Sequence, residues 1–304
     1  MEHVASKTLL PAQTLLVRDA PRCCVIENIS DTAFLVAAYR ALETERSDAL
    51  FQDPFAKELV GEKGLRIVDS LRSGRSSSWF LVARTCILDA WILKLIHEEN
   101  IDTVLNLAAG LDARAYRLEL PPQLRWYDVD LPDISNHKET VLKNQKPKCE
   151  YHLVKMDLAN QANRAKLFAE IAQQSKKTLV ISEGFLMYLT PTQAIELAQE
   201  LAQHTPFRFW LAELLGPVQL ALIKIKWGKT FKAANSEMAF APKEGPAFFK
   251  PFGWNSQEFK SSFDEAIRIG RAPKGSALLK GAAHLLPRKM RDVINRAGIA
   301  LLIR

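Results

Sequence analysis

The middle of the chain alternates between short apolar runs and longer stretches in which apolar residues recur with helical spacing. A nearly continuous apolar run is typical of a strand buried on both faces. Strands that alternate with helices every 25–30 residues or so (about one βαβ step) are typical of a doubly wound, mostly parallel α/β sheet of the Rossmann-like kind. The expected strands are 103–107, 125–129, 151–154, 178–182 and 207–213, with helices beginning near Asp112, Pro132, Asn160 and Pro191.

The sequence before this alternation predicts helices only. Ser30-Asp31-Thr32 is expected to cap a helix that runs to about Thr44, and Asp53-Pro54 to start a second one. Residues 79–99 are rich in apolar side chains and predict a long, largely buried helix. Residues 1–26 show no clear periodicity and are expected to form an N-terminal arm.

The last third of the chain gives a weaker pattern. A helix is expected over 217–232, and the prolines and glycines of 242–253 suggest a lid or loop insertion. Trp254-Asn255-Ser256 is expected to start another helix, and 266–269 and 299–303 are candidate late strands, with antiparallel pairing as one option. With no repeat and no linker visible, we expect one elaborated domain over 27–304 rather than two domains.

Composition narrows the class of protein. An apolar content of 48% and a charged content of 25% are ordinary for a globular protein, and no apolar stretch is long enough for a membrane span. The N-terminus has no basic segment followed by an apolar core, so no secretory signal is expected. Four cysteines without disulfide or metal spacing, and six histidines that never pair at i, i+4, predict a reduced cytoplasmic protein without a metal site.

Positive charge is concentrated near the C-terminus. Residues 268–304 contain nine lysines and arginines and one acid, whereas the chain as a whole carries +7. This segment could favour an acidic partner, RNA or an anionic membrane surface. The alternative, which we favour, is a solvated basic face on an amphipathic segment, because no RNA-binding motif accompanies it.

A small-residue turn follows the first expected strand. Ala108-Ala109-Gly110 leaves little side-chain bulk where the strand ends, so a ligand can approach the backbone closely. Ligands of parallel α/β sheets bind outside the carboxyl ends of the strands. The turn therefore predicts a nucleotide-like cofactor, although such a turn can also serve only the packing of a helix on the sheet.

Acidic residues end the next strands. Asp130 lies 20 residues after Gly110, at the end of the second strand, and is placed to accept the two hydroxyls of a ribose. The alternative is a cap for the helix that starts at Pro132, which Asp133 could serve as well. Asp157-Leu158 after the third strand is suited to an adenine ring, although an aspartate after a strand is more often a cap or turn residue. Glu183 after the fourth strand is hard to explain as core.

Seven short segments carry these features in a specific order. They are Ser30-Asp31-Thr32-Ala33, Asp53-Pro54, Ala83-Arg84-Thr85, Asn106-Leu107-Ala108-Ala109-Gly110-Leu111-Asp112-Ala113-Arg114, Asp128-Val129-Asp130-Leu131-Pro132 with Lys138, Asp157-Leu158 and Glu183-Gly184-Phe185-Leu186-Met187-Tyr188-Leu189-Thr190. In this order they resemble the leucine carboxyl methyltransferase family, class I enzymes that use S-adenosylmethionine. That family includes phosphatase-tail methyltransferases and polyketide carboxyl O-methyltransferases. The resemblance ends near Leu215, and Ala108 stands where many class I enzymes have glycine.

The resemblance implies a role for several residues. Arg84 would hold the carboxylate of the cofactor's methionine moiety, Gly110 would line its path and Asp130 would bind the ribose. Asp157 and Leu158 would bind the adenine, and Glu183 would lie near the methionine amine. It also divides the domain into a helical part (27–100), a cofactor-binding core (101–215) and a lid with acceptor-side elements (216–304).

The role of Arg84 stays open on the residues alone. An internal ion pair with Asp89 or exposure on the polar side of the helix would also explain it, because buried cations are rare unless paired.

The methyl acceptor is the least determined part of the prediction. An ionised carboxylate needs no general base, so an arginine and a hydroxyl would suffice to aim it, and Arg40 and Tyr188 are our candidates. A phenol would require a base, but nothing in the sequence places His137 or His152 near the pocket. We expect O-methylation of a small-molecule carboxylate in biosynthesis. A protein C-terminus or modified RNA as acceptor, and a non-catalytic binding protein on the same fold, remain alternatives.

Overall fold

The computed structural model describes residues 30–70, 79–233, 236–283 and 296–304. The expected arm at 1–26 lies outside them, as does the most basic stretch, 284–295. The elements, in chain order, are α1 (Asp31–Thr44), α2 (Ala56–Ser70), α3 (Trp79–Glu98), β1 (Thr103–Leu107), α4 (Arg114–Arg117), β2 (Arg125–Asp130), α5 (Pro132–Leu142), β3 (Glu150–Lys155), α6 (Gln161–Gln174), β4 (Thr178–Ser182), η2 (Leu186–Tyr188), α7 (Pro191–Gln203), β5 (Phe207–Leu214), α8 (Pro217–Ala233), η3 (Gly245–Phe252), β6 (Asn255–Ser261), α9 (Ser262–Arg268), α10 (Ser276–Ala283) and β7 (Gly298–Ile303).

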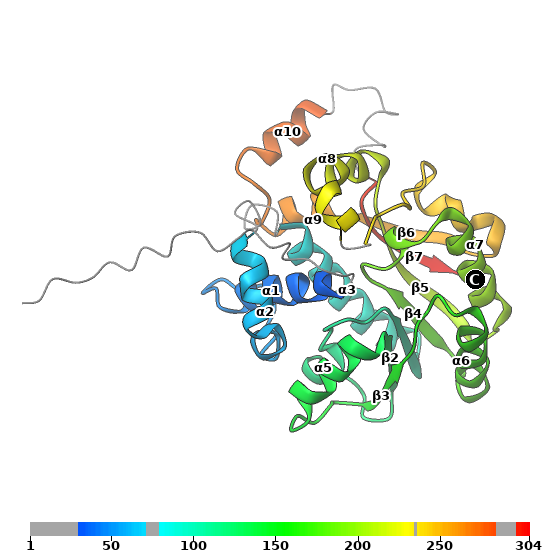
Figure 1. Cartoon of the computed structure of the whole chain (residues 1–304). Coiled ribbons are helices and arrows are strands. Elements are labelled where there is room, and N and C mark those ends of the chain that lie inside the picture. The colour runs from blue at the N-terminus through cyan, green and yellow to red at the C-terminus, as the bar shows by residue number, and fades with distance from the viewer. Residues whose placement is uncertain (1–29, 71–78, 234–235, 284–295) are drawn as a thin grey trace, which may run out of the picture.

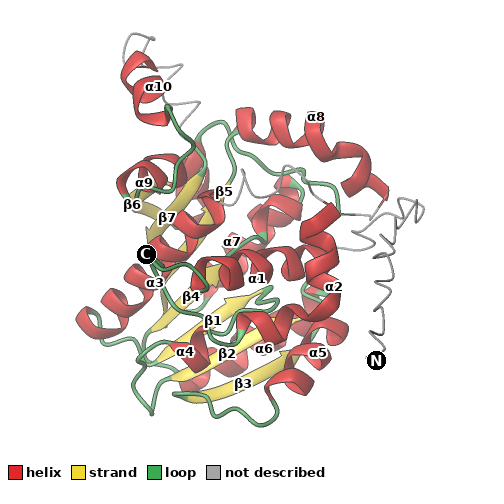
Figure 2. Ribbon diagram, turned by 90° about the vertical axis from the view of Figure 1, so that its left-hand side faces the viewer, coloured by secondary structure: helices red, strands yellow, loops and turns green. Residues whose placement is uncertain are grey.

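A seven-stranded sheet of order β3-β2-β1-β4-β5-β7-β6 forms the centre of the described molecule (Figures 1 and 2). The first five strands are parallel, and β7 runs antiparallel to both of its neighbours. The chain order reverses between β1 and β4, which is where ligands of doubly wound sheets bind. The predicted Rossmann-like sheet is therefore confirmed, with each of its five parallel strands within one residue of the expected bounds.

Successive side chains of the strands enter two separate cores. On β1, Val104 packs with residues of α1, α2, α3 and α5, whereas Leu105 packs with α6 and α7. Leu179 and Val180 of β4 divide in the same way, because side chains of a strand alternate between its two faces. Helices therefore cover both faces of the sheet, α1 to α3 and α5 on one side and α6 and α7 on the other (Figure 1).

Two predicted helix starts have the capping chemistry that the sequence suggests. Thr190 and Gln193 form a reciprocal capping box at α7, and the side chain of Asn160 accepts a hydrogen bond from the backbone of Asn163 at α6. Ser30 precedes α1 but makes no capping hydrogen bond with its side chain. Asp53 and Pro54 lie in a turn before α2, which begins at Ala56.

Three predicted elements differ from the structure. The helix expected from Asp112 is a single turn, α4, because Leu118 leaves the helix in an extended conformation. Residues 254–256 do not start a helix and 266–269 do not form a strand: β6 runs from Asn255 and 266–268 belong to α9. The sequence misled here because β6 is an edge strand with mostly exposed side chains, so it lacks the apolar alternation of a half-buried strand.

No helix within the described part of the chain combines the length and the apolar character that a bilayer crossing requires.

Candidate cofactor and acceptor site

A cavity of about 590 Å³ opens at the carboxyl ends of the parallel strands. Its walls come from the ends of β1, β2, β4 and β5, and from α1 and α3, which cover this edge of the sheet. Every site residue predicted from the sequence lines it: Arg40, Arg84, Gly110, Asp130, Asp157, Leu158, Glu183 and Tyr188. Residues that are up to about 150 positions apart in the chain thus meet in one cavity, as the order of the strands requires.

The turn after β1 has the backbone conformation that the small residues suggested. Gly110 has φ +52°, and a Cβ atom there would lie 3.0 Å from the Cβ of Ala33. Its backbone N–H donates a hydrogen bond of 2.5 Å to Oδ2 of Asp130. Ala108 also has a positive φ, +54°, which costs a non-glycine residue free energy. The backbone of the turn is therefore covered by little side-chain bulk where it lines the cavity.

The two acids of β2 have different environments. Asp128 is buried, with Oδ2 2.6 Å from Nζ of Lys138 and Oδ1 accepting hydrogen bonds from Asn106 and Trp126. Asp130 instead lines the cavity, and within the described part of the chain its carboxylate accepts only backbone hydrogen bonds, from Gly110 and Leu131. Burial raises the pKa of Asp130, and these two hydrogen bonds oppose the rise. Asp130 does not cap α5, since the helix has no side-chain cap.

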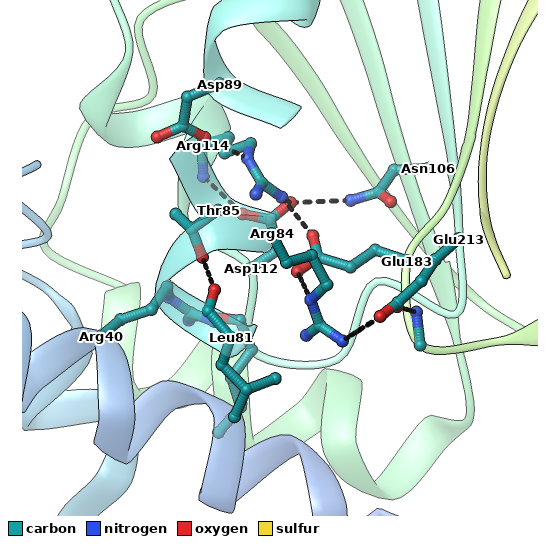
Figure 3. A network of polar contacts seen from close by, with 12 residues as sticks. Arg40, Leu81, Arg84, Thr85, Asp89, Asn106, Asp112, Arg114, Glu183 and Glu213 are labelled. Carbon is teal, nitrogen blue, oxygen red and sulfur yellow. Dashed lines mark hydrogen bonds and ion pairs between the residues drawn. The ribbon is translucent and has the colours of Figure 1, made fainter. Parts of the chain in front are cut away.

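Arg84 is held between two carboxylates (Figure 3). Its Nε lies 2.7 Å from Oε1 of Glu183, and its Nη1 donates a 2.9 Å hydrogen bond to Oε2 of Glu213. The guanidinium is therefore buried and paired, and neither the ion pair with Asp89 nor the exposed position weighed above is correct. Among the described residues Nη2 of Arg84 has no hydrogen-bonding partner, and Arg84 lines the cavity.

Arg114 joins this cluster to the rest of the site. Its Nη1 lies 2.6 Å from Oε2 of Glu183 and 2.8 Å from Oδ2 of Asp112, and its Nε donates to Asp89 at 2.6 Å (Figure 3). Asp112 in turn accepts a hydrogen bond from Asn106 of β1. Such a connected network fixes the orientation of each side chain because every buried charge has several partners.

The network also sets the protonation of its acids. Burial by itself would raise the pKa of Glu183, but Arg114 and Arg84 outweigh burial and lower it. Burial raises the pKa of Glu213, although Arg84 opposes this. Glu183 is therefore the more firmly ionised of the two carboxylates that face Arg84.

Hydrogen bonds fix the loop that follows β3. Asp157 accepts a 2.8 Å hydrogen bond from the backbone of Ala159, and the carbonyl of Leu158 accepts one from Arg164. Arg164 is itself held by Glu200 of α7 at 2.7 Å. The Asp157-Leu158 pair thus has a fixed position at the cavity wall.

The two residues predicted to bind the acceptor, Arg40 and Tyr188, both line the cavity but differ in their hydrogen bonds. Arg40 donates from Nε to Asp53 at 2.8 Å and from Nη2 to the carbonyl of Leu111 at 2.6 Å. Its Nη1 has no hydrogen-bonding partner among the described residues. Tyr188 of η2 makes a side-chain hydrogen bond with Thr32 of α1, and burial raises the pKa of its hydroxyl.

A comparison with family models matches residues 33–202 to the family described as "Leucine carboxyl methyltransferase". A "Putative S-adenosyl-L-methionine-dependent methyltransferase" of Mycobacteroides abscessus is 31% identical over 288 residues, which cover 86% of this chain and 92% of that protein. The chain belongs to the leucine carboxyl methyltransferase family. It is an S-adenosylmethionine-dependent methyltransferase, and the resemblance seen in the sequence is confirmed.

Further similar proteins agree with the assignment of this chain as a methyltransferase. A similarly named protein of Parafrankia sp. is 34% identical over 185 residues, 58% of this chain and 59% of that protein. A solved structure of a DUF574 family protein from Streptomyces avermitilis has the same fold, with a TM-score of 0.57 at 14% identity over 90% of this chain and 96% of that one. A solved "putative methyltransferase" from Thermobifida fusca gives a TM-score of 0.52 over 92% of this chain and 95% of that one.

The cavity of the methyltransferase fits its cofactor in charge. S-adenosylmethionine carries a sulfonium and an ammonium against one carboxylate, so a site that holds it benefits from a surplus of negative charge. Carboxylates outnumber cations in the described lining: Asp112, Asp130, Asp157, Glu183, Glu196 and Glu213 face Arg40, Arg84 and Arg164. When bound, the cofactor supplies an activated methyl group, and the protein supplies position and electrostatics.

Sequence reasoning missed Glu213, which forms the second half of the clamp on Arg84. It accepts a 2.6 Å hydrogen bond from the backbone of Gly184 as well, and so ties the end of β5 to the end of β4. The signal was present in the sequence, because Glu213 is an acid at the end of an apolar strand, as Glu183 is. The histidines considered as bases lie elsewhere: His137 contacts the carbonyl of Leu59, and His152 contacts Glu150.

Proposed function

We propose that this methyltransferase is an O-methyltransferase that forms a methyl ester on the carboxylate of a small, largely apolar molecule. The observation that carries the proposal is the chemistry of the cavity lining. Within the part of the chain that the structure describes, this lining contains no histidine, lysine or cysteine. An alcohol or phenol acceptor would need such a group to take its proton, whereas a carboxylate is already ionised at neutral pH.

Two acids of the lining, Glu183 and Glu213, are poor substitutes for a base. Glu183 is paired with Arg84 and Arg114, and Glu213 with Arg84 and the backbone of Gly184. A carboxylate that is fully hydrogen-bonded loses these contacts when it takes up a proton. The lack of a free base among these paired acids supports an acceptor that is already deprotonated when it binds.

In the proposed arrangement Asp130 accepts hydrogen bonds from the ribose hydroxyls, the loop at Asp157 and Leu158 holds the adenine, and Gly110 lines the path of the methionine moiety. The Arg84 and Glu183 pair faces the amino-acid end of the cofactor, with Nη2 of Arg84 toward its carboxylate and Glu183 toward its ammonium. The positive Arg84 would thus meet the negative carboxylate of the methionine moiety, and the negative Glu183 would meet its positive ammonium.

The apolar part of the cavity lining is evidence for a small apolar substrate. It includes Leu35, Val36, Phe80, Ile223 and Met238. In the proposal these side chains exclude water around the reacting oxygen. In the proposal the Tyr188 hydroxyl and Nη1 of Arg40 aim one carboxylate oxygen at the methyl group. In-line displacement from a sulfonium needs chiefly this alignment. A lining of this kind does not suit RNA, whose recognition rests on phosphate contacts and stacking.

The test is a matched panel of acceptors. The purified protein is incubated with S-adenosylmethionine and with pairs of apolar compounds that differ only in bearing a carboxylate or a hydroxyl. Products are identified by a mass increase of one methylene and by treatment with mild alkali, which releases methanol from an ester but not from an ether. Alkali-labile products from the acids alone support the proposal. Stable products from the alcohols or phenols would overturn it.

A further inference from the structure

Four exposed apolar side chains lie on two helices that project from one end of the molecule. Of the five large apolar side chains that are exposed in the described residues, Val218, Leu222 and Ile225 belong to α8, and Leu278 belongs to α10. Leu222 is 60%, Ile225 83% and Leu278 81% exposed. In Figures 1 and 2 both helices lie at the top of the molecule, away from β3 and α5.

The three residues of α8 form one stripe. Positions 218, 222 and 225 are separated by four and three residues, so their side chains lie on the same face of the helix. We call this stripe the outer face of α8. The inner side of the helix points the other way, since Ile223 lines the cofactor and acceptor cavity. The helix therefore has apolar residues on both sides, and only the inner side is covered by the described protein.

The charge around the outer face has one sign. Residues 217–233 contain four lysines and no acid. Lys224 and Lys232 are exposed and form no ion pair with any described residue, and the same holds for Lys274 just before α10. Lys280 of α10, in contrast, pairs with Asp264 at 2.7 Å. An exposed apolar stripe flanked by unpaired lysines is typical of a helix that lies in the interface of an anionic membrane.

We propose that α8, with α10 at the same end of the molecule, docks this methyltransferase on an anionic lipid surface. The apolar side chains of the outer face enter the boundary between headgroups and acyl chains, and the lysines contact the lipid phosphates. Such contacts weaken as salt screens them.

This inference does not depend on the identity of the methyl acceptor. It does place the cavity behind the docked helix, because Ile223 of α8 lines the cavity while Leu222 of the outer face is exposed. An amphiphilic acceptor held in the membrane would thus be close to the cavity wall.

The test is flotation of the full chain with vesicles of phosphatidylglycerol and phosphatidylcholine, compared with vesicles of phosphatidylcholine alone. We expect binding to the anionic vesicles at low salt and at least tenfold weaker binding to the neutral ones. The double variant Leu222→Ser/Ile225→Ser should reduce binding to anionic vesicles at least tenfold, and so should Lys224→Glu/Lys232→Glu. Leu50→Ser is the matched control, because Leu50 is also exposed but lies far along the chain, in the segment between α1 and α2.

Binding of S-adenosylhomocysteine, measured by calorimetry, checks that each variant is folded, and it is expected to be unchanged. Failure of the unmodified protein to bind anionic vesicles would overturn the proposal, as would equal binding by the Leu222→Ser/Ile225→Ser variant. A dimer in light scattering that this variant abolishes, without vesicle binding, would show that a second copy covers the outer face instead.

Discussion

The backbone N–H of Gly110 donates a hydrogen bond to Oδ2 of Asp130 across the ends of β1 and β2. The two residues are separated by 20 positions, and the bond joins the bare turn of the first strand to the acid of the second. It fixes the carboxylate of Asp130 at the wall of the cavity. In the proposed arrangement, the ribose contact therefore rests on the turn and the acid together rather than on either alone.

Asp130→Ala is expected to weaken binding of S-adenosylhomocysteine by about 1–3 kcal/mol, because the ribose hydroxyls would lose their acceptor. Calorimetric titration measures the change, and circular dichroism confirms that the variant is folded. Asp133→Ala is the control, since Asp133 is exposed on the first turn of α5. Unchanged affinity in folded Asp130→Ala would remove the ribose assignment.

The turn allows a pair of substitutions with opposite expected effects. Gly110→Ala forces a side chain into positive φ and against Ala33, and should lower the free energy of unfolding by about 1–3 kcal/mol. Ala108→Gly relieves positive φ at a non-glycine residue, and should raise it by up to about 1 kcal/mol after the entropy of glycine is counted. Urea denaturation compares the two. A loss of stability in Ala108→Gly would contradict the described turn.

Glu183→Gln should destabilise the protein by about 3 kcal/mol, because Arg84 and Arg114 would lose a buried carboxylate. The matched control is Glu139→Gln, which removes an exposed ion pair with Lys155 and should cost no more than about 1 kcal/mol. Both are measured by urea denaturation at pH 7. Equal effects of the two substitutions would mean that the buried network contributes no more than a surface pair.

The stability lost in Glu183→Gln should depend on pH in a defined direction. The folded protein lowers the pKa of Glu183, so the stabilisation is complete above the unfolded value of about 4.5. It is lost as the pH falls through the lowered pKa, because the unfolded chain takes up a proton first. The difference between wild type and variant should therefore shrink from pH 6 toward pH 3. A constant difference across this range would argue against an ionised Glu183.

Tyr188→Phe should lower kcat/KM for the acceptor by up to about tenfold, the scale of one hydrogen bond, and leave cofactor affinity unchanged. Kinetics with an acceptor found in the panel, together with calorimetry, separate the two effects. Tyr127→Phe is the control, because Tyr127 stacks on His152 and does not line the cavity. A fall in cofactor affinity alone would assign Tyr188 to the cofactor instead of the acceptor.

The parallel core could be predicted from the sequence because its strands are buried on both faces. Thr103–Leu107 and Thr178–Ser182 consist entirely of buried residues, and their apolar runs set their bounds to the residue. The acids at strand ends were visible for the same reason, since Asp130 and Glu183 interrupt apolar segments where a core residue would be expected. Edge strand β6 could not be predicted, because its exposed side chains leave no such pattern.

The sequence by itself determined the order of strands and helices, the bare turn at Gly110 and the acids that meet at one edge of the sheet. These are local properties, set by burial and by backbone conformation within short segments. Only the tertiary structure decided the partners of the charges. Arg84 binds Glu183 and Glu213, which lie 99 and 129 positions away, and not the nearby Asp89. A buried arginine pairs with whichever carboxylates the packing of the chain brings within hydrogen-bonding distance. The spacing of residues along one helix does not determine which carboxylates these are.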